Sequence, residues 1–289
     1  MPESDMPASP RDISRRDFVR AGVGSGFAAA VLPIAAQTEV RTDSAGLTVG
    51  EVMVPVGDFK VPAYRAMPAG RTALPVVLVV SEVFGVHEYI ADVARRFAKQ
   101  GYLAVAPELF VRQGDAGSYG EIAKLLAEVI SQVPDAQVMR DLDACAAWAG
   151  AQGGDTRRLA VTGFCWGGRI TWLYAAHNPG VKAAVSWYGR LVGQTGALQP
   201  VHPVDVAAAL HAPVLGLYGG KDEGTPQDTM QRMRAALAAG GAAARRSEFV
   251  VYPDAPHAFH ADYRPSYRKD AAEDGWRRCL AWFKTHGAA

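Results

Sequence analysis

The chain has 289 residues, of which 49% are apolar and 20% charged, and its formal net charge is +1. That length suits one large α/β domain or two small ones, with ample apolar material for a core. The near-neutral charge gives no support for nucleic acid or an anionic membrane surface as a partner. The three cysteines cannot all pair within the chain, and their spacing matches no metal site.

Residues 1–36 differ in character from the rest of the chain. Ser14-Arg15-Arg16-Asp17-Phe18 has the paired arginines of a twin-arginine export signal. The apolar stretch from Gly22 to Ala36 is too short to span a bilayer comfortably. The alternative interpretation is a basic disordered tail. The signal interpretation predicts export by the twin-arginine machinery and a periplasmic location.

Residues 37–289 alternate short β-rich runs with helical patterns and show no linker, so we expect a single domain. Strands are predicted at Gly50 to Val54, Phe59 to Arg65, Leu74 to Val80, Tyr102 to Pro107, Leu159 to Thr162, Ala183 to Trp187, Val214 to Tyr218 and Phe249 to Tyr252. Helices are predicted at His87 to Gln100, Tyr119 to Ser131, Asp135 to Gly150, Gly167 to His177, Pro226 to Gly240 and Ser266 to His286. The continuous apolar runs indicate a doubly wound α/β fold: a mostly parallel sheet with helices on both faces and an antiparallel N-terminal hairpin.

The most specific motif is Gly163-Phe164-Cys165-Trp166-Gly167-Gly168, between a predicted strand and a predicted helix. It matches the nucleophile elbow G-x-S-x-G with cysteine in place of serine. Such a turn lifts the central side chain to a helix N-terminus, where free N–H groups stabilise an anion. The alternative is a packing role for Cys165, the role expected for Cys145 and Cys279 on their amphipathic helices.

An acid and a histidine follow in the order that an α/β-hydrolase triad requires. Asp222 follows the predicted strand Val214 to Tyr218, and His257 follows the strand Phe249 to Tyr252. Together with Cys165 they form the predicted triad. Glu223 is the alternative acid. His260 is the alternative base, although a position lining the pocket suits it better.

A thiol of ordinary pKa is mostly neutral at pH 7, so Cys165 needs activation by the helix N-terminus and by His257, which Asp222 would orient. Glu82 follows an apolar strand and is predicted to be a desolvated carboxylate with a raised pKa that exchanges a proton with Cys165. The alternative is a salt bridge from Glu82 to Arg112 or another base.

Three strings, Ser81-Glu82-Val83-Phe84-Gly85-Val86, the elbow at 163–168 and Pro256-His257-Ala258-Phe259, resemble the dienelactone hydrolase (carboxymethylenebutenolidase) family. The likeness covers roughly residues 50 to 286. It implies a single α/β-hydrolase domain with a Cys-His-Asp triad and no cofactor. It further implies that Glu82 controls the resting thiol, that the N–H groups of Val83 and Trp166 form the oxyanion hole, and that Arg112 binds a substrate carboxylate.

The chain departs from the family where a second arginine should follow the catalytic histidine. His260 stands nearby instead, and Arg264 comes seven positions after His257, so the small dicarboxylate-like lactone is not assured as substrate. Phe84 and Tyr119 are aromatic candidates for the substrate pocket, with packing as the alternative. The predicted function is hydrolysis of a small ester or enol-lactone. A broad-specificity carboxylesterase and a non-catalytic binding or redox protein are the alternatives. The sequence leaves the oligomeric state open, and a monomer is compatible with it.

Overall fold

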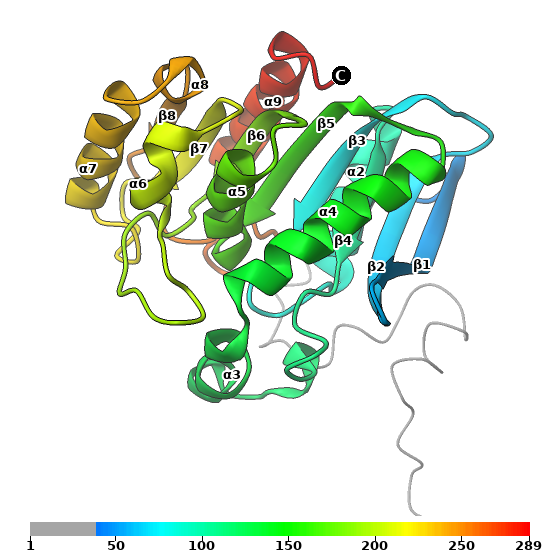
Figure 1. Ribbon diagram of the computed structural model, residues 1–289, viewed down its shortest axis with the longest axis horizontal. Coiled ribbons are helices and arrows are strands. Elements are labelled where there is room, and N and C mark those ends of the chain that lie inside the picture. Colours follow the sequence, from blue (N-terminus) through cyan, green and yellow to red (C-terminus); the bar gives the residue numbers. More distant parts are fainter. Residues whose placement is uncertain (1–38) are drawn as a thin grey trace, which may run out of the picture.

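The computed structural model describes residues 39–289, so the leader predicted over residues 1–36 lies outside the described residues. This part of the chain builds one eight-stranded sheet (Figure 1). Its strands are β1 (Leu47–Val56), β2 (Phe59–Pro68), β3 (Leu74–Val80), β4 (Leu103–Pro107), β5 (Gly154–Phe164), β6 (Val181–Trp187), β7 (Val214–Gly219) and β8 (Glu248–Tyr252). All eight predicted strands are present, and β5 begins earlier than the sequence indicated.

The strand order is β1-β2-β4-β3-β5-β6-β7-β8. The pairs β1–β2 and β2–β4 are antiparallel, and the other neighbours are parallel. The predicted doubly wound, mostly parallel sheet with an antiparallel N-terminal hairpin is therefore confirmed. Side chains of β3 alternate between two buried layers: Leu78 belongs to one core cluster, and Val77 and Val79 belong to the other. Both faces are covered, which explains the uninterrupted apolar run.

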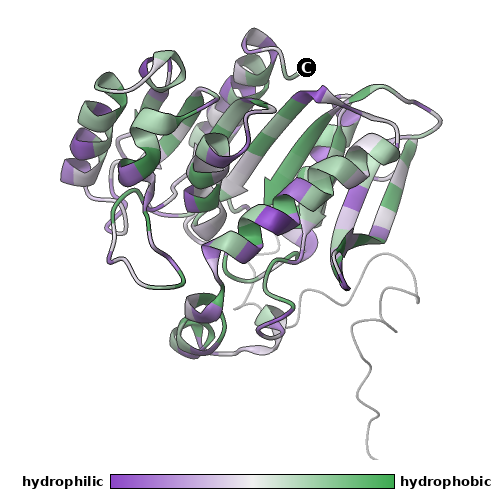
Figure 2. Ribbon diagram, in the orientation of Figure 1, coloured by the Kyte–Doolittle hydropathy of each residue, from purple (hydrophilic) through white to green (hydrophobic). Residues whose placement is uncertain are grey.

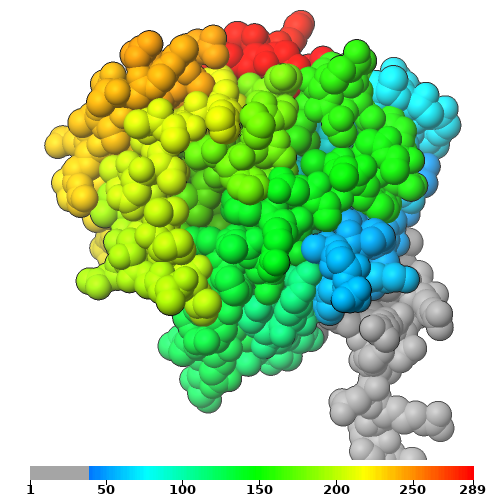
Figure 3. Space-filling view, in the orientation of Figure 1, coloured from blue at the N-terminus to red at the C-terminus, as the bar shows by residue number. Residues whose placement is uncertain are grey.

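Helices cover the two faces of the sheet. The longer ones are α2 (Glu88–Lys99), α4 (Asp135–Ala151), α5 (Trp166–His177), α7 (Gln227–Ala238) and α9 (Lys269–Thr285). One core cluster contains residues of α4, α5 and α7, and the other contains residues of α2 and α9. In Figure 1 the α4 and α5 helices lie in front of the sheet, and in Figure 3 the green and yellow surface over them covers much of this face. No helix among the described residues is long and apolar enough to cross a membrane.

Three short helices complete the fold. The helix predicted at Tyr119 to Ser131 is shorter than expected: α3 (Ile122–Glu128) is followed by a 3-10 turn at Ile130–Gln132. The sequence pattern did not predict α6 (Pro203–Val206) or α8 (Ala242–Arg245), because four residues carry too little periodicity. Figure 2 shows the apolar strands inside the molecule and the polar residues concentrated on the outer helices.

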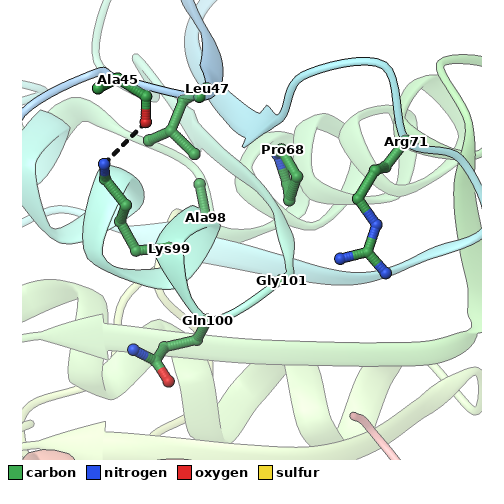
Figure 4. A pocket seen from close by; sticks show the side chains of 9 residues that line it. Ala45, Leu47, Pro68, Arg71, Ala98, Lys99, Gln100 and Gly101 are labelled. Carbon is green, nitrogen blue, oxygen red and sulfur yellow. Dashed lines mark hydrogen bonds between the residues drawn. The ribbon is translucent and has the colours of Figure 1, made fainter.

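The topology decides where a site can form. The loops after β3, β5, β6, β7 and β8 all leave the carboxyl edge of the parallel strands, the edge where α/β proteins bind ligands. A shallow pocket at Leu47, Lys99 and Gly101, drawn in Figure 4, lies at the opposite edge, since Gly101 stands two positions before the first residue of β4. There Lys99 Nζ donates a hydrogen bond to the carbonyl of Ala45 at 2.8 Å.

Candidate active site

The backbone around Cys165 makes a sharp turn between β5 and α5. Cys165 has φ 55° and ψ −112°, in the left-handed region that non-glycine residues rarely adopt. A Cβ on Gly163 would lie 2.2 Å from the Gly167 carbonyl oxygen, and one on Gly167 would lie 2.3 Å from the Val80 carbonyl oxygen. Only glycine fits at these two positions, and their close packing holds the strained Cys165 backbone in place.

The loops after β7 and β8 bring Asp222 and His257 together. His257 Nδ1 lies 2.8 Å from Asp222 Oδ2, and the Asp222 side chain is fully buried. Asp222 Oδ1 accepts a hydrogen bond from the N–H of Gly224 at 2.8 Å, so both carboxylate oxygens are engaged. Glu223, the alternative acid, is exposed. The acid facing the imidazole is thus Asp222.

His257 also interacts with Cys165 by a hydrogen bond and by charge. Burial alone would lower the pKa of His257, but hydrogen bonds with Asp222 and Cys165 raise it to about 10. The imidazole is therefore protonated at neutral pH, and a cation faces the sulfur. Such a pair can supply a thiolate for attack and later a proton for a leaving group.

Two backbone N–H groups stand at the positions expected of an oxyanion hole. Val83 lies in the loop after β3, and Trp166 is the first residue of α5. In the part of the chain that the structure describes, neither N–H donates to a protein acceptor. The contact of Gly167 with the carbonyl oxygens of Val80 and Ser81 holds the elbow against the end of β3. This arrangement can hold a developing oxyanion.

The prediction for the pKa of Glu82 is wrong. Glu82 is 1% exposed, and burial alone would raise its pKa, but His87, Arg264 and Tyr263 together hold it below the ordinary value. The Tyr263 hydroxyl donates to Glu82 Oε2 at 2.7 Å. Glu82 is thus an ionised carboxylate rather than a neutral acid. The alternative of a salt bridge to Arg112 does not hold, but a different base is present, because His87 Nε2 lies 3.8 Å from Glu82 Oε2.

The substrate-binding role expected of Arg112 also needs correction. Its guanidinium makes two hydrogen bonds to the Asp141 carboxylate, at 2.6 and 2.9 Å, and lies 4.2 Å from the centre of the Phe59 ring. Asp141 belongs to α4, and its side chain is 1% exposed. The bidentate ion pair with the buried Asp141 carboxylate engages the guanidinium that a substrate carboxylate would need. Arg112 therefore fixes the loop after β4 to α4.

Arg264 is the arginine that lies near the nucleophile. Burial would lower the pKa of Arg264, but the charges of Glu82 and Cys165 raise it. Its guanidinium carbon lies 5.2 Å from the centre of the Phe84 ring, which brings Phe84 to this side of the site. Within the described residues, the guanidinium makes no hydrogen bond or close ion pair. Arg264 thus places a cation among the neighbours of Cys165.

His260 and Tyr119 do not lie where the sequence suggested. His260 is 2% exposed, shares a 2.7 Å hydrogen bond with the Tyr89 hydroxyl and lies 4.4 Å from Trp187 between ring centres. Burial holds the pKa of His260 well below its usual value, so it is a neutral core residue and neither a base nor a pocket lining. Tyr119 interacts with Glu128 of α3 and shows no contact with the Cys165, Asp222 and His257 group among the described residues.

Sequence reasoning missed two residues of this edge. Tyr188 directly follows β6, is fully buried, has φ 41° and packs edge-on against His257 with 5.1 Å between ring centres. Its strain has a cause, because a Cβ on the following Gly189 would lie 2.3 Å from the Gly168 carbonyl carbon. His87 precedes α2 and lies 3.8 Å from Glu82. The position of Tyr188 directly after a parallel strand was a usable signal.

The two other cysteines are buried, as the sequence predicted. Burial raises the pKa of the Cys145 thiol. It raises the pKa of the Cys279 thiol well above the ordinary value. Neither thiol is available for reaction at neutral pH.

Comparison with known proteins agrees with the fold. The model of the dienelactone hydrolase family matches residues 61–287. A candidate carboxymethylenebutenolidase of Methylorubrum extorquens is 58% identical over 283 residues, which are 98% of this chain and 96% of the relative. One from Escherichia coli K12 is 54% identical over 264 residues, 91% of this chain and 96% of the relative.

Solved structures give the same result. The crystal structure of a candidate dienelactone hydrolase from Klebsiella pneumoniae is 57% identical with a TM-score of 0.80, covering 82% of this chain and 98% of its own. A dienelactone hydrolase-like promiscuous phosphotriesterase from metagenomic libraries, 22% identical with a TM-score of 0.68 and covering 83% of this chain and 99% of its own, shares the fold. The chain belongs to the dienelactone hydrolase family and has the α/β-hydrolase fold.

Proposed function

We propose that this protein is a thiol hydrolase that cleaves activated esters or enol-lactones through Cys165, His257 and Asp222. The observation that carries the proposal is the 2.8 Å pair of His257 with the buried Asp222, directed at a cysteine on a strained elbow. A packing cysteine needs neither a strained backbone nor a protonated imidazole beside it.

The reaction then runs in two halves. The Cys165 thiolate attacks the carbonyl carbon, and the N–H groups of Val83 and Trp166 hold the resulting oxyanion. Collapse breaks the bond to the leaving oxygen, which takes its proton from His257, and a thioester on Cys165 remains. The now neutral His257 removes a proton from water, the hydroxide attacks the thioester, and the free acid leaves. Cys165 departs as the thiolate beside His257, which carries the proton again.

The leaving group must be a good one in this scheme. A thiolate is itself a good leaving group, so a tetrahedral intermediate returns to substrate unless the other oxygen leaves easily. Enolates and aryloxides meet this condition, and amide nitrogens do not. We therefore propose enol-lactones and activated esters, rather than peptides, as the substrates.

Arg264 narrows the substrate further. Its guanidinium, near Cys165 and Phe84, suits an acyl portion that carries one carboxylate or similar anion. Because Arg112 is engaged by Asp141, a second arginine is not offered to the ligand. This difference from the two-arginine pattern favours the second candidate, a carboxylesterase of broader specificity with the same mechanism.

We also propose that residues 1–36 direct export through the twin-arginine machinery, which would place the enzyme in the periplasm. A paired Arg15→Lys and Arg16→Lys change would then retain the protein in the cytoplasm, while the parent is recovered from the periplasm. Recovery of both from the periplasm would reject the signal.

A panel of lactones and aryl esters, each with and without a carboxylate on the acyl side, tests the function on the parent and on Cys165→Ala. We expect the parent to hydrolyse the activated members and the variant to lose about 10³-fold or more in kcat/KM. Full activity of Cys165→Ala on every substrate would reject the thiol mechanism and leave a binding or redox role.

A further inference from the structure

Two buried polar atoms without hydrogen-bond partners lie on neighbouring side chains behind the nucleophile. They are Nε2 of His87 and Oε1 of Glu82, and the two side chains are 9% and 1% exposed. His87 Nε2 lies 3.8 Å from the other Glu82 oxygen, Oε2. Buried polar groups are almost always paired, so an imidazole and a carboxylate left side by side in this way require an explanation beyond packing.

Several charged or titratable groups face this pair. Tyr263 donates its hydroxyl to Glu82, and Arg264 and Tyr188 each interact with both Glu82 and Cys165. From α2, the Tyr89 ring stacks on His87 with 5.9 Å between centres. Glu108, in the loop after β4, accepts a hydrogen bond from the N–H of Val86 at 3.1 Å. Glu82 and Cys165 thus share two neighbours, Arg264 and Tyr188.

The fold presents these partners from two sides. Tyr263 and Arg264 come from the loop that also carries His257, whereas His87 comes from the start of α2. A fully buried carboxylate favours its protonated form unless opposite charges and donors surround it. Unlike Tyr263 and Arg264, His87 is not on the loop that carries His257, so it can hold Glu82 independently of that loop.

We propose that His87 is a positioning residue that holds the Glu82 carboxylate in place, so that Glu82 in turn holds Tyr263 and Arg264 beside Cys165. His87 touches no reacting atom in this scheme and acts on the nucleophile through Glu82. The inference rests on the proposed function in taking Cys165 as the reactive group.

The pH dependence of Cys165 alkylation by iodoacetamide tests the proposal. In His87→Gln the Glu82 carboxylate takes up a proton in the acid range. A negative charge that shares the neighbours Arg264 and Tyr188 with Cys165 then disappears, and the thiolate is favoured. We expect the acid midpoint of alkylation to fall by about 0.5–1 pH unit. Glu82→Gln should lower the midpoint in the same direction. In the Glu82→Gln background, His87→Gln should cause no further shift.

His260→Gln is the matched control, because it makes the same change at a buried imidazole whose hydrogen-bond partner is Tyr89 rather than Glu82. Its midpoint should equal that of the parent. An unchanged midpoint in His87→Gln, a rise, or a shift that persists in the Glu82→Gln background would each overturn the role of His87. His87→Asn provides a shorter amide with the same expected shift if the glutamine variant does not fold. Failure of Cys165 to react in the parent would instead reject the proposed function itself.

Discussion

His257 Nδ1 lies 2.8 Å from Asp222 Oδ2, and the Asp222 carboxylate is closed to solvent while the imidazole is partly open. This relationship fixes which nitrogen of His257 is bound to the carboxylate and leaves the other available to the sulfur and to water. Burial would lower the pKa of His257, but Asp222 and Cys165 raise it to about 10.

Asp222→Asn should therefore change both catalysis and titration. We expect kcat/KM on an aryl ester to fall about 10³- to 10⁴-fold, because the amide neither stabilises the imidazolium nor enforces the tautomer. The pKa of His257, followed by NMR, should move from about 10 toward its ordinary value. Glu223→Gln is the control and should behave as the parent, since Glu223 is exposed. Loss of activity in Glu223→Gln with an active Asp222→Asn would exchange the two roles.

Substitution of Arg264 should affect substrate binding, whereas substitution of Arg112 should affect the stability of the fold. Arg264→Gln is expected to raise KM at least about tenfold for esters that carry an acyl carboxylate and to leave neutral esters nearly unaffected. Arg112→Gln should leave this preference intact and lower the melting temperature, since it leaves the buried Asp141 without its ion pair. The KM values of each variant for a matched pair of charged and neutral esters measure this preference. A loss of charge preference in Arg112→Gln alone would restore Arg112 as the ligand of the carboxylate.

A pH-dependent contribution to stability is expected from Asp262. Burial raises its pKa to about 6, with Arg96 opposing the rise. Since this folded value exceeds the unfolded one, the native state binds more protons between pH 4 and 6. The contribution of Asp262 to stability is then present below about pH 4 and lost as pH rises through 6. Urea unfolding gives the free energy of unfolding of the parent and of Asp262→Asn across this range. As the pH rises, the value for the variant should increase relative to that for the parent by about 1–3 kcal/mol. A constant difference would show that Asp262 does not titrate there.

Breaking the buried ion pair of Arg169 and Asp135 should cost more free energy of unfolding than breaking an exposed ion pair. The guanidinium makes two 2.7 Å hydrogen bonds to the carboxylate, and the two residues are 3% and 7% exposed. Arg169 lies on α5, which begins at the elbow. Asp135→Ala leaves a buried cation unpaired, and we expect a loss of about 3–5 kcal/mol in the free energy of unfolding. Asp155→Ala, at an exposed pair with Arg157, should cost less than about 1 kcal/mol. Equal losses in the two variants would contradict this account.

The strand pattern and the elbow motif predicted much of this molecule because both depend on local sequence. Continuous apolar runs located the parallel strands, and the loops that follow them placed Cys165, Asp222 and His257 on one edge. The glycines around Cys165 marked a turn that other residues cannot make.

What the sequence did not reveal depends on partners far apart in the chain. Arg112 is engaged by Asp141, 29 positions away, and His260 by Tyr89, 171 positions away. Contacts between residues so far apart in the chain leave no periodic pattern in the sequence. The charge state of Glu82 likewise depends on Tyr263, 181 positions away, so burial alone gave the wrong direction for its pKa.

The proposed mechanism requires a covalent acyl intermediate on Cys165, which mass spectrometry of the enzyme quenched during turnover of an activated ester can detect. We expect the acyl mass to be added once, on the peptide that contains Cys165, and to be absent from Cys165→Ala. Cys145 and Cys279 should remain unmodified, since both are buried. An acyl group on any other residue, or turnover by Cys165→Ala at the parental rate, would contradict it.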